Sequence, residues 1–463
     1  MSLARTPIST APRRIPARTR CLIGISLGYF MVLLDMTVLS VAEPDLASSL
    51  HTSVAGLQWA TTGYTVAFAA LLLSAGAVAD RYGAHRVLRS GITVFTLVSL
   101  LSAAAPDLKS LVALRVVLGM AAAACVPASL AVIARLYPQP AERARALSVW
   151  AAISGAAVAA GPIAGGALVD AAGWRSIFLV NVPIGLAVLA LTAGRTMVCP
   201  RGESRISWLS QLAAAVVLAL FTDAVVAAGA RGWIHTLCSS AAAALSVIVF
   251  VALERRSPVP VLNRALLRED RVRAGLLAGA AVNFALTGGL FVLPLVLQQR
   301  YGFGPLETGL AFLPLTLPFA VNPPFTGRMV ARVGPRRPVL GGLALLAAGG
   351  VVLAAAVHAA GGYPFIAAGL LMTGLGVSYA LPALVAAVVG AAPEGTAGSV
   401  GGLLNAVRQA GATLGVAVMG AVITYGADRA LLASAAACAT ALVVFARTGG
   451  RGTRGRQDPD KRL

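Results

Sequence analysis

Charged side chains are scarce in this sequence. Only 12% of its 463 residues are Asp, Glu, Lys or Arg, whereas 58% are hydrophobic. A soluble protein of this length needs far more polar surface to cover its core. The composition therefore excludes a soluble globular fold. It indicates apolar helices in a lipid bilayer, where each backbone polar group must be paired within the protein.

The common motifs of enzymes and metal proteins are also missing. No HExxH, GxSxG, Walker loop or EF-hand pattern occurs. The five cysteines have no CxxC spacing and frame neither a disulfide scaffold nor a zinc site: Cys21, Cys125, Cys199, Cys238 and Cys438. We therefore expect no enzyme and no cofactor. Without a nucleotide site, transport would have to draw its energy from an ion gradient.

Long apolar segments recur along the whole chain. Each is close to the ~20 residues that a bilayer requires, and there are fourteen: 21–42, 55–79, 87–105, 110–134, 146–169, 176–196, 208–228, 234–253, 272–298, 306–329, 338–358, 363–388, 400–424 and 428–447. The first is expected to be a retained helix, since no A-x-A cleavage site follows it. Omitting the pair at 208–253 would leave twelve.

The basic residues are distributed unevenly between the two sides of these segments. With alternating sides, 30 of the 37 Lys and Arg residues fall on the side of the termini and five in the opposite loops. This imbalance predicts that both termini are cytoplasmic in a multi-pass protein of the cell membrane. The net charge of +20 then faces anionic lipid, and no folded basic surface remains for nucleic acid.

An internal repeat divides the chain. The stretch GAVADRYGAHRVLRSG (76–91) resembles GRMVARVGPRRPVLGG (327–342), and each lies between the second and third segments of a six-segment block. Such repeats build secondary transporters. The expected divisions are a basic tail, a first bundle, a linker with two extra helices, a second bundle and a second basic tail: 1–20, 21–200, 201–270, 271–448 and 449–463.

Four polar or glycine-rich stretches interrupt the apolar segments: SAGAVADRYGAHRVLRSG (74–91), VLLDMTVLSVAEPDL (32–46), LVALRVVLGMAAAA (111–124) and GAAVAAGPIAGG (155–166). They resemble motifs of the major facilitator superfamily, in its fourteen-helix drug:proton antiporter group, with methylenomycin-resistance exporters as the nearest likeness. The resemblance covers nearly the whole chain apart from the tails. It implies an all-α polytopic fold of two six-helix bundles plus a central two-helix insertion.

The first stretch resembles the loop motif G-x-L-A-D-R-x-G-R-K of this family. The matching residues are Gly76, Asp80, Arg81, Gly83 and Arg86. A glycine permits the turn, and an acid at the membrane surface can pair with nearby bases in one state and separate in another. An inner gate explains the acid and the glycines better than an ordinary basic loop does.

Two opposite charges are expected at similar depth inside the membrane. Asp35 lies within the first segment, where a lone carboxylate costs on the order of 2.5–3.5 kcal/mol, and Arg115 lies within the fourth. In the family the first-helix acid serves in proton coupling or cation binding, so Asp35 and Arg115 form a candidate exchange pair. A static structural pair is the alternative. Glu43 is expected to be solvated near the outer surface.

Two further stretches resemble motifs of the same group. Gly161, Pro162, Gly165 and Gly166 match the antiporter helix, whose face the resemblance packs against the other bundle. Plain small-residue packing is the alternative there. GSVGGLLNAVRQAGATLG (398–415) resembles the thirteenth helix and carries three candidate cavity residues, Asn405, Arg408 and Gln409, for which a structural role is equally open.

These patterns predict proton-coupled efflux of a small organic compound, such as an antibiotic or other drug, by alternating access. The expected partners are that substrate, protons and the lipid bilayer, and the functional unit is a monomer. The alternatives are an importer or uniporter of the same fold and a non-transporting membrane receptor. The residues do not identify the substrate.

Overall fold

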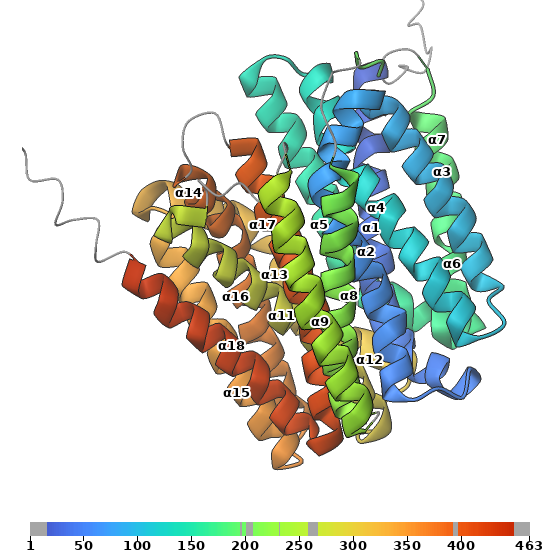
Figure 1. Ribbon diagram of the computed structural model, residues 1–463, viewed down its shortest axis with the longest axis vertical. Helices are drawn as coiled ribbons and strands as arrows, with labels where there is room; N and C mark the ends of the chain where they lie inside the picture. Colours follow the sequence, from blue (N-terminus) through green and yellow to red (C-terminus); the bar gives the residue numbers. More distant parts are fainter. Residues whose placement is uncertain are drawn as a thin grey trace, which may run out of the picture.

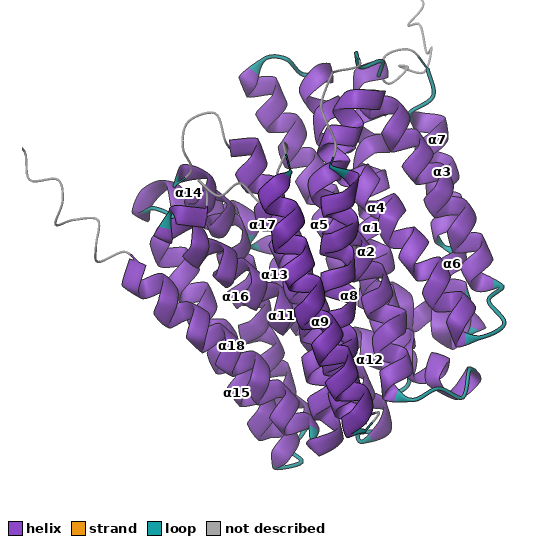
Figure 2. Ribbon diagram, in the orientation of Figure 1, coloured by secondary structure: helices purple, strands orange, loops and turns teal. Residues whose placement is uncertain are grey.

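The computed structural model describes residues 16–194, 197–200, 207–230, 232–257, 267–391 and 397–448. Over these ranges the ordered elements are helices, and no strand occurs (Figure 2). The all-α fold expected from the sequence is thereby confirmed. Both basic tails lie almost wholly outside the described residues, as do residues 201–206 and 258–266 of the linker.

Seven helices make up the first group, here called the N-half: α1 Ala17–Ser49, α2 Val54–Tyr82, α3 Ala84–Ala103, α4 Leu108–Leu136, α5 Pro140–Ala172, α6 Ser176–Leu179 and α7 Asn181–Leu191. Polar side chains begin two of them. Ser53 accepts a hydrogen bond from the amide of Gly56, and Asp107 accepts one from the amide of Ser110. These caps satisfy amides that the first turn of each helix leaves unpaired.

The remaining helices form a hairpin and a second group, here called the C-half. The hairpin consists of α8 (Trp208–Ala230) and α9 (Trp233–Arg256), and α8 packs on both α2 and α17, along the seam between the halves (Figure 1). The C-half comprises α11 Asp270–Gln299, α12 Pro305–Ala311, α13 Leu313–Val321, α14 Pro323–Val333, α15 Arg336–His358, α16 Tyr363–Gly390, α17 Ala397–Val422, the short 3-10 helix η1 Ile423–Tyr425 and α18 Ala427–Thr448.

The expected number of membrane crossings is met only in part. Eleven of the described helices are long and apolar enough to cross a bilayer, and α2 makes a twelfth although it bends by 61° between Leu72 and Ser74. The expected span at 306–329 is divided into α12, α13 and α14, each of which begins at or next to a proline. The sixth expected span consists of two short helices, α6 and α7. The count of fourteen therefore stays a prediction.

Corresponding helices of the two halves pack in the same order. In the N-half, α1 packs on α5 and α3 packs on α4, just as α11 packs on α17 and α15 on α16 in the C-half. The repeated stretch also has matching turns. Gly83 (φ 91°) joins α2 to α3, and Gly334 (φ 75°) joins α14 to α15, both in a conformation that glycine adopts without steric cost.

The alternating helices give the molecule two faces. We call the face where α1 begins and α18 ends the termini face, and the opposite one the far face. On the termini face Arg336 donates a hydrogen bond to the carbonyl of Ala446 (2.8 Å). On the far face Asp45 accepts one from the amide of Trp174 (2.8 Å), so the loops on each face tie neighbouring helices together.

This arrangement predicts the sidedness of four exposed basic residues. Arg86 and Arg337 lie on the termini face, and Lys109 and Arg429 lie on the far face. In a cysteine-free background, Cys introduced at 109 or 429 should react with a membrane-impermeant maleimide added to intact cells. Cys at 86 or 337 should react only after the cells are permeabilised, because the excess of Lys and Arg on that face predicts that it is cytoplasmic. Labelling of positions 86 and 109 from the same side would contradict the fold.

Candidate functional site

A buried ion pair lies in the middle of the N-half. Asp35 on α1 is 4% exposed and Arg115 on α4 is 1% exposed. Oδ2 of Asp35 is in direct contact with Nη1 of Arg115. The structure thus brings together the two charges that the sequence placed at similar depth. Their part in proton coupling stays a prediction.

Neighbouring helices fix the orientation of Arg115. Its Nε donates to the carbonyl of Ala60 on α2 (3.1 Å), and its guanidinium lies 4.5 Å from the centre of the Tyr64 ring. The hydroxyl of Tyr64 in turn donates to the carbonyl of Val32 on α1 (3.4 Å). A cation over an aromatic face is further stabilised when both are shielded from water. The ion pair therefore connects α1, α2 and α4.

The second oxygen of Asp35 has a partner that the sequence reasoning missed. Asn181, at the start of α7, is fully buried and donates from Nδ2 to Asp35 Oδ1 (2.9 Å) and to Ser99 Oγ (3.3 Å). The stretch WRSIFLVNVPIG (174–185) contained a signal, since Asn181 is a polar residue between apolar ones. A neutral amide stands out less than a charge does in an apolar segment.

The expectation that Glu43 is solvated was wrong. Its side chain is buried, with the residue 2% exposed, and Oε1 accepts a hydrogen bond from Thr61 Oγ1 (3.0 Å). Oε2 has no hydrogen-bond partner among the described residues. Position along a helix gives depth in the bilayer but not the direction of the side chain, and Glu43 points from α1 towards α2.

The glycines of the α5 motif contact two different helices. A Cβ at Gly161 would lie 1.9 Å from Thr37 Oγ1, and one at Gly165 would lie 2.7 Å from the carbonyl oxygen of Val38, both on α1. A Cβ at Gly166 would lie 2.4 Å from the carbonyl oxygen of Pro305 in the C-half. The motif therefore holds α1 close beside Asp35 and also packs against the other half. The contact of Gly166 with the C-half is of the kind that the resemblance implies.

The two halves are joined by hydrogen bonds in the part of the bundle nearer the far face. Gln58 on α2 donates to the carbonyls of Val416 (3.2 Å) and Ala417 (2.7 Å) on α17. In the same region Thr413 donates to Thr65 (2.8 Å). On the other side of the bundle Gln298 of α11 donates to the carbonyl of Val41 (3.0 Å). These contacts close the molecule towards the far face.

Glycines nearer the termini face have open space beside them. A Cβ placed at Gly76 on α2, Gly155 on α5, or Gly401 and Gly402 on α17 would meet no atom within 4 Å. Two of the same helices, α5 and α17, contact the opposite half nearer the far face. There a Cβ at Gly166 or Gly420 would lie 2.4 Å from an atom of the other half. At these glycines the two halves are therefore in close contact towards the far face and not towards the termini face.

The candidate gate residues lie towards the termini face. Asp80 and Arg81 occupy the part of α2 that follows its bend, and Arg86 lies in the first turn of α3. All three are exposed, and within the described part of the chain Asp80 makes no ion pair with either arginine. His85, which occupies a basic position of the motif, is buried and accepts a hydrogen bond from the amide of Cys199 (3.1 Å).

Two of the three candidate residues of α17, Asn405 and Arg408, form a polar cluster with Asn283 of α11. Arg408 donates from Nε to Asn283 Oδ1 (3.2 Å) and from Nη1 to Asn405 Oδ1 (3.1 Å). Gln409 lies beside them, and its Oε1 has no hydrogen-bond partner among the described residues. Asn405, Arg408 and Gln409 are all half-buried, so they remain accessible to a small molecule or to water.

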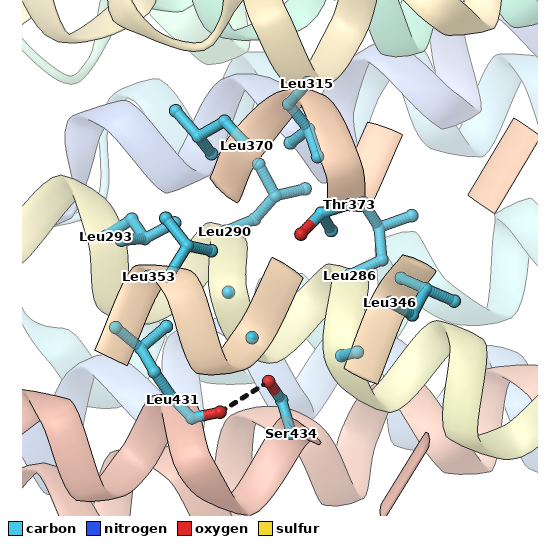
Figure 3. A pocket seen from close by; sticks show the side chains of 13 residues that line it. Leu286, Leu290, Leu293, Leu315, Leu346, Leu353, Leu370, Thr373, Leu431 and Ser434 are labelled. Atoms are coloured by element: carbon cyan, nitrogen blue, oxygen red, sulfur yellow. Dashed lines mark hydrogen bonds between the residues drawn. The ribbon is translucent and has the colours of Figure 1, made fainter. Parts of the chain in front are cut away.

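An enclosed pocket inside the C-half does not contribute a site. It is lined mainly by leucines of α11, α13, α15, α16 and α18 (Figure 3) and encloses only about 10 Å³. The Ser434 hydroxyl at its edge already donates to the carbonyl of Leu431 (2.8 Å). A space of that size is at the lower limit for one water molecule, so it is a packing defect of the core.

The bundle and its buried charges define a class of protein, a secondary membrane transporter. Residues 25–320 and 275–462 match the Major Facilitator Superfamily. Because the match spans nearly the whole sequence, the chain belongs to this superfamily of transporters and is not an enzyme. Among the described residues no group of three or more His, Cys, Asp or Glu side chains could hold a metal ion.

Curated relatives support the same assignment. The chain is 35% identical over 405 residues to the multidrug resistance protein Stp of Mycobacterium tuberculosis (strain CDC 1551 / Oshkosh), which covers 87% of this chain and 75% of that protein. It is 34% identical over 406 residues to the methylenomycin A resistance protein of Bacillus subtilis (strain 168), with 87% of each chain covered. The resemblance read from the motifs is confirmed.

A solved structure agrees in fold. A bacterial homologue of the human lysosomal transporter Spinster, crystallised in an inward-facing and unoccupied conformation, matches with a TM-score of 0.67. The match covers 96% of this chain and 99% of that chain at 18% identity, which shows the fold alone.

The ion pair predicts an asymmetric response to mutation. Arg115→Leu leaves the Asp35 carboxylate buried without its cation, which should destabilise the fold by about 3–5 kcal/mol. The double variant Asp35→Asn/Arg115→Leu removes both charges and should recover a large part of the loss. Thermal unfolding of the purified protein in detergent, followed by tryptophan fluorescence, measures both effects.

Arg337→Leu provides the control, because Arg337 is exposed. It should leave the unfolding temperature nearly unchanged. An Arg115→Leu variant as stable as the parent, or a double variant no more stable than Arg115→Leu, would show that the buried pair does not act as a unit.

Proposed function

We propose that this chain exports a small organic compound, such as an antibiotic or another drug, from the cytoplasm in exchange for protons that enter the cell. The observation that carries the proposal is the buried Asp35–Arg115 pair. Burial in the membrane disfavours a charged carboxylate, whereas the neighbouring guanidinium favours one. A movement that separates the two charges would therefore allow Asp35 to take up a proton. The curated relatives, named as multidrug and antibiotic resistance proteins, support the direction of transport.

Protonation of Asp35 would weaken its contact with Arg115. The guanidinium would then keep the Ala60 carbonyl and the Tyr64 ring, while Asp35 would lose its strongest bond to α4. Thr37 and Val38 follow Asp35 on α1 and touch the glycines of α5, which also packs on the C-half. A movement of α1 at Asp35 would therefore be passed to α5 and from α5 to the contact between the halves.

The conformation suits one stage of an alternating-access cycle. The distribution of Lys and Arg predicts that the termini face is cytoplasmic. With the far-face contacts closed and the halves out of contact at the glycines nearer the termini face, the molecule is inward-facing in our interpretation. From this state it would take up its substrate and release a proton. Rocking of the N-half against the C-half would give the other state.

Asp35→Asn tests the proton step. Asn keeps the shape of the side chain and loses its titration, so proton-driven transport should fall to background while the protein stays folded. Transport is measured as uptake into inverted membrane vesicles under an imposed proton gradient. The substrate is one found by screening a panel of antibiotics against cells that express the chain.

The exposed Asp270 supplies a matched control, since Asp270→Asn makes the same chemical change outside the buried pair. It should transport like the parent. If Asp35→Asn shows the same proton-driven uptake as the parent, the proposed role of Asp35 is contradicted. Uptake by the parent that ignores the proton gradient would favour a uniporter, and the absence of any transported compound would favour a receptor.

A second experiment tests the proposed inner gate. If Asp80 forms pairs at the inner rim only when that side is closed, Asp80→Asn should shift the population towards the inward-facing state and slow turnover. Gly402→Cys is a suitable reporter, because its added side chain meets no neighbour near the termini face. Its rate of reaction with a maleimide added from the cytoplasmic side should rise in the Asp80→Asn background.

The same Asp270→Asn change serves as the control for the loss of one surface carboxylate. Equal reaction rates at position 402, together with unchanged turnover, would reduce residues 80–86 to an ordinary basic loop.

A further inference from the structure

Arg408 is half-buried and has no acidic partner among the described residues. Arg115 is paired with Asp35, whereas Arg408 on α17 bonds only to the neutral amides of Asn283 and Asn405. No carboxylate of the described residues lies within ion-pair distance of Arg408. A cation at membrane depth without a counter-charge is unfavourable, so its site favours an anion from outside the chain.

Arg408 has donors to spare for such an anion. A guanidinium has five N–H groups arranged as a fork, and two of them are used by Asn283 and Asn405. The remaining donors match the two oxygens of a carboxylate, and hydrogen bonds to a charged acceptor are about twice as strong as neutral ones. The half-buried side chain is accessible.

An aromatic surface lies at the same depth in the other half. Tyr29 on α1 and Trp150 on α5 stack with ring centres 4.5 Å apart and planes inclined by 7°. Counted from the termini face, Tyr29, Trp150 and Arg408 lie about 18, 15 and 17 Å along their helices. Tyr29 is close enough to Arg408 to interact with it electrostatically. The cation and the stacked rings therefore lie at similar depth in opposite halves.

The surroundings of Arg408 are open and incompletely bonded. Asn405 follows Gly402 by three residues and Gln409 follows Asn405 by four, which puts the three positions on one face of α17. The space beside Gly402 is empty, and Oε1 of Gln409 has no partner among the described residues. The open space beside Gly402 leaves room for a ligand close to Asn405, which Arg408 contacts.

We propose that this region binds an organic anion. Arg408 holds the carboxylate of the substrate, and the rings of Tyr29 and Trp150 hold its flat, apolar body by stacking. This inference rests on the export function proposed above and names its substrate class, an aromatic carboxylic acid in its ionised form. A cationic drug is disfavoured here, because Arg408 repels it and no carboxylate of the described residues compensates.

Binding of three probes with the same ring tests the proposal. The probes are 2-naphthoate, 2-naphthalenemethanol and 2-naphthylmethylammonium, titrated calorimetrically into the full chain in lipid nanodiscs and into empty nanodiscs. The parent should bind the carboxylate at least tenfold more tightly than the alcohol or the amine. Tyr29→Leu should weaken the binding of the carboxylate and the alcohol by similar factors, because it removes only the stacking surface.

Two substitutions isolate the charge. Arg408→Gln should reduce carboxylate binding to the level of the alcohol and leave the alcohol unchanged, which also shows that the variant is folded. Asn405→Asp keeps Arg408 and adds a carboxylate at the position of the present 3.1 Å contact, so it should abolish the preference for the carboxylate in the same way. Arg337→Gln, an exposed change of the same kind, should have no effect.

Equal binding of the three probes by the parent would overturn the proposal. A carboxylate preference that persists in both Arg408→Gln and Asn405→Asp would do so too. These measurements need no proton gradient, so their outcome is separate from the transport assay. An anion preference in a protein without proton-driven transport would refute the proposed function and leave the binding site standing.

Discussion

The cost of a carboxylate inside the bilayer is the constraint on which the N-half depends. Asp35 is tolerated because Arg115 neutralises it and Asn181 bonds to its second oxygen. Satisfying one acid thereby connects α1, α4 and α7, and Arg115 adds α2 through the Ala60 carbonyl. A single proton on Asp35 would weaken its contacts with both Arg115 and Asn181. The group most suited to proton exchange is therefore also a central structural bond of its bundle.

The glycines of α5 link this bond to the rest of the molecule. Because Gly161 and Gly165 have no side chain, the backbone of α5 lies directly against Thr37 and Val38, beside Asp35. Further along the same helix, Gly166 lies against the first residues of α12 in the C-half. The hydrogen bonds that close the far face are few, and each contributes about 0.5–1.5 kcal/mol. Such a closure is firm enough to hold one state and weak enough to be reversed by a change in charge.

The sequence predicted those features that depend on composition and on isolated charges. Hydropathy located the helices, and Asp35 and Arg115 were conspicuous because ionised groups are rare in apolar segments. Features that depend on the direction of a side chain were not accessible in this way. Asn181 is neutral and was passed over, while Glu43 was placed in solvent although it faces Thr61. Hydropathy also does not resolve the 61° bend of α2 or the division of residues 305–333 into three helices, each of which begins at or next to a proline.

If the substrate is an anion, the energetics of export differ from those of a neutral drug. A proton entering the cell carries one charge down the membrane potential, worth about 2.3 kcal/mol per 100 mV. An anion leaving the cell moves charge in the same electrical direction and contributes a similar amount. One exchange would then release about 4.6 kcal/mol per 100 mV, enough for roughly three decades of concentration at about 1.4 kcal/mol each. Asp35 would provide the proton site in the N-half and Arg408 the anion site in the C-half. Separate sites in separate halves require coupling through the helices rather than direct competition, and the contacts of α5 with both α1 and α12 offer that connection.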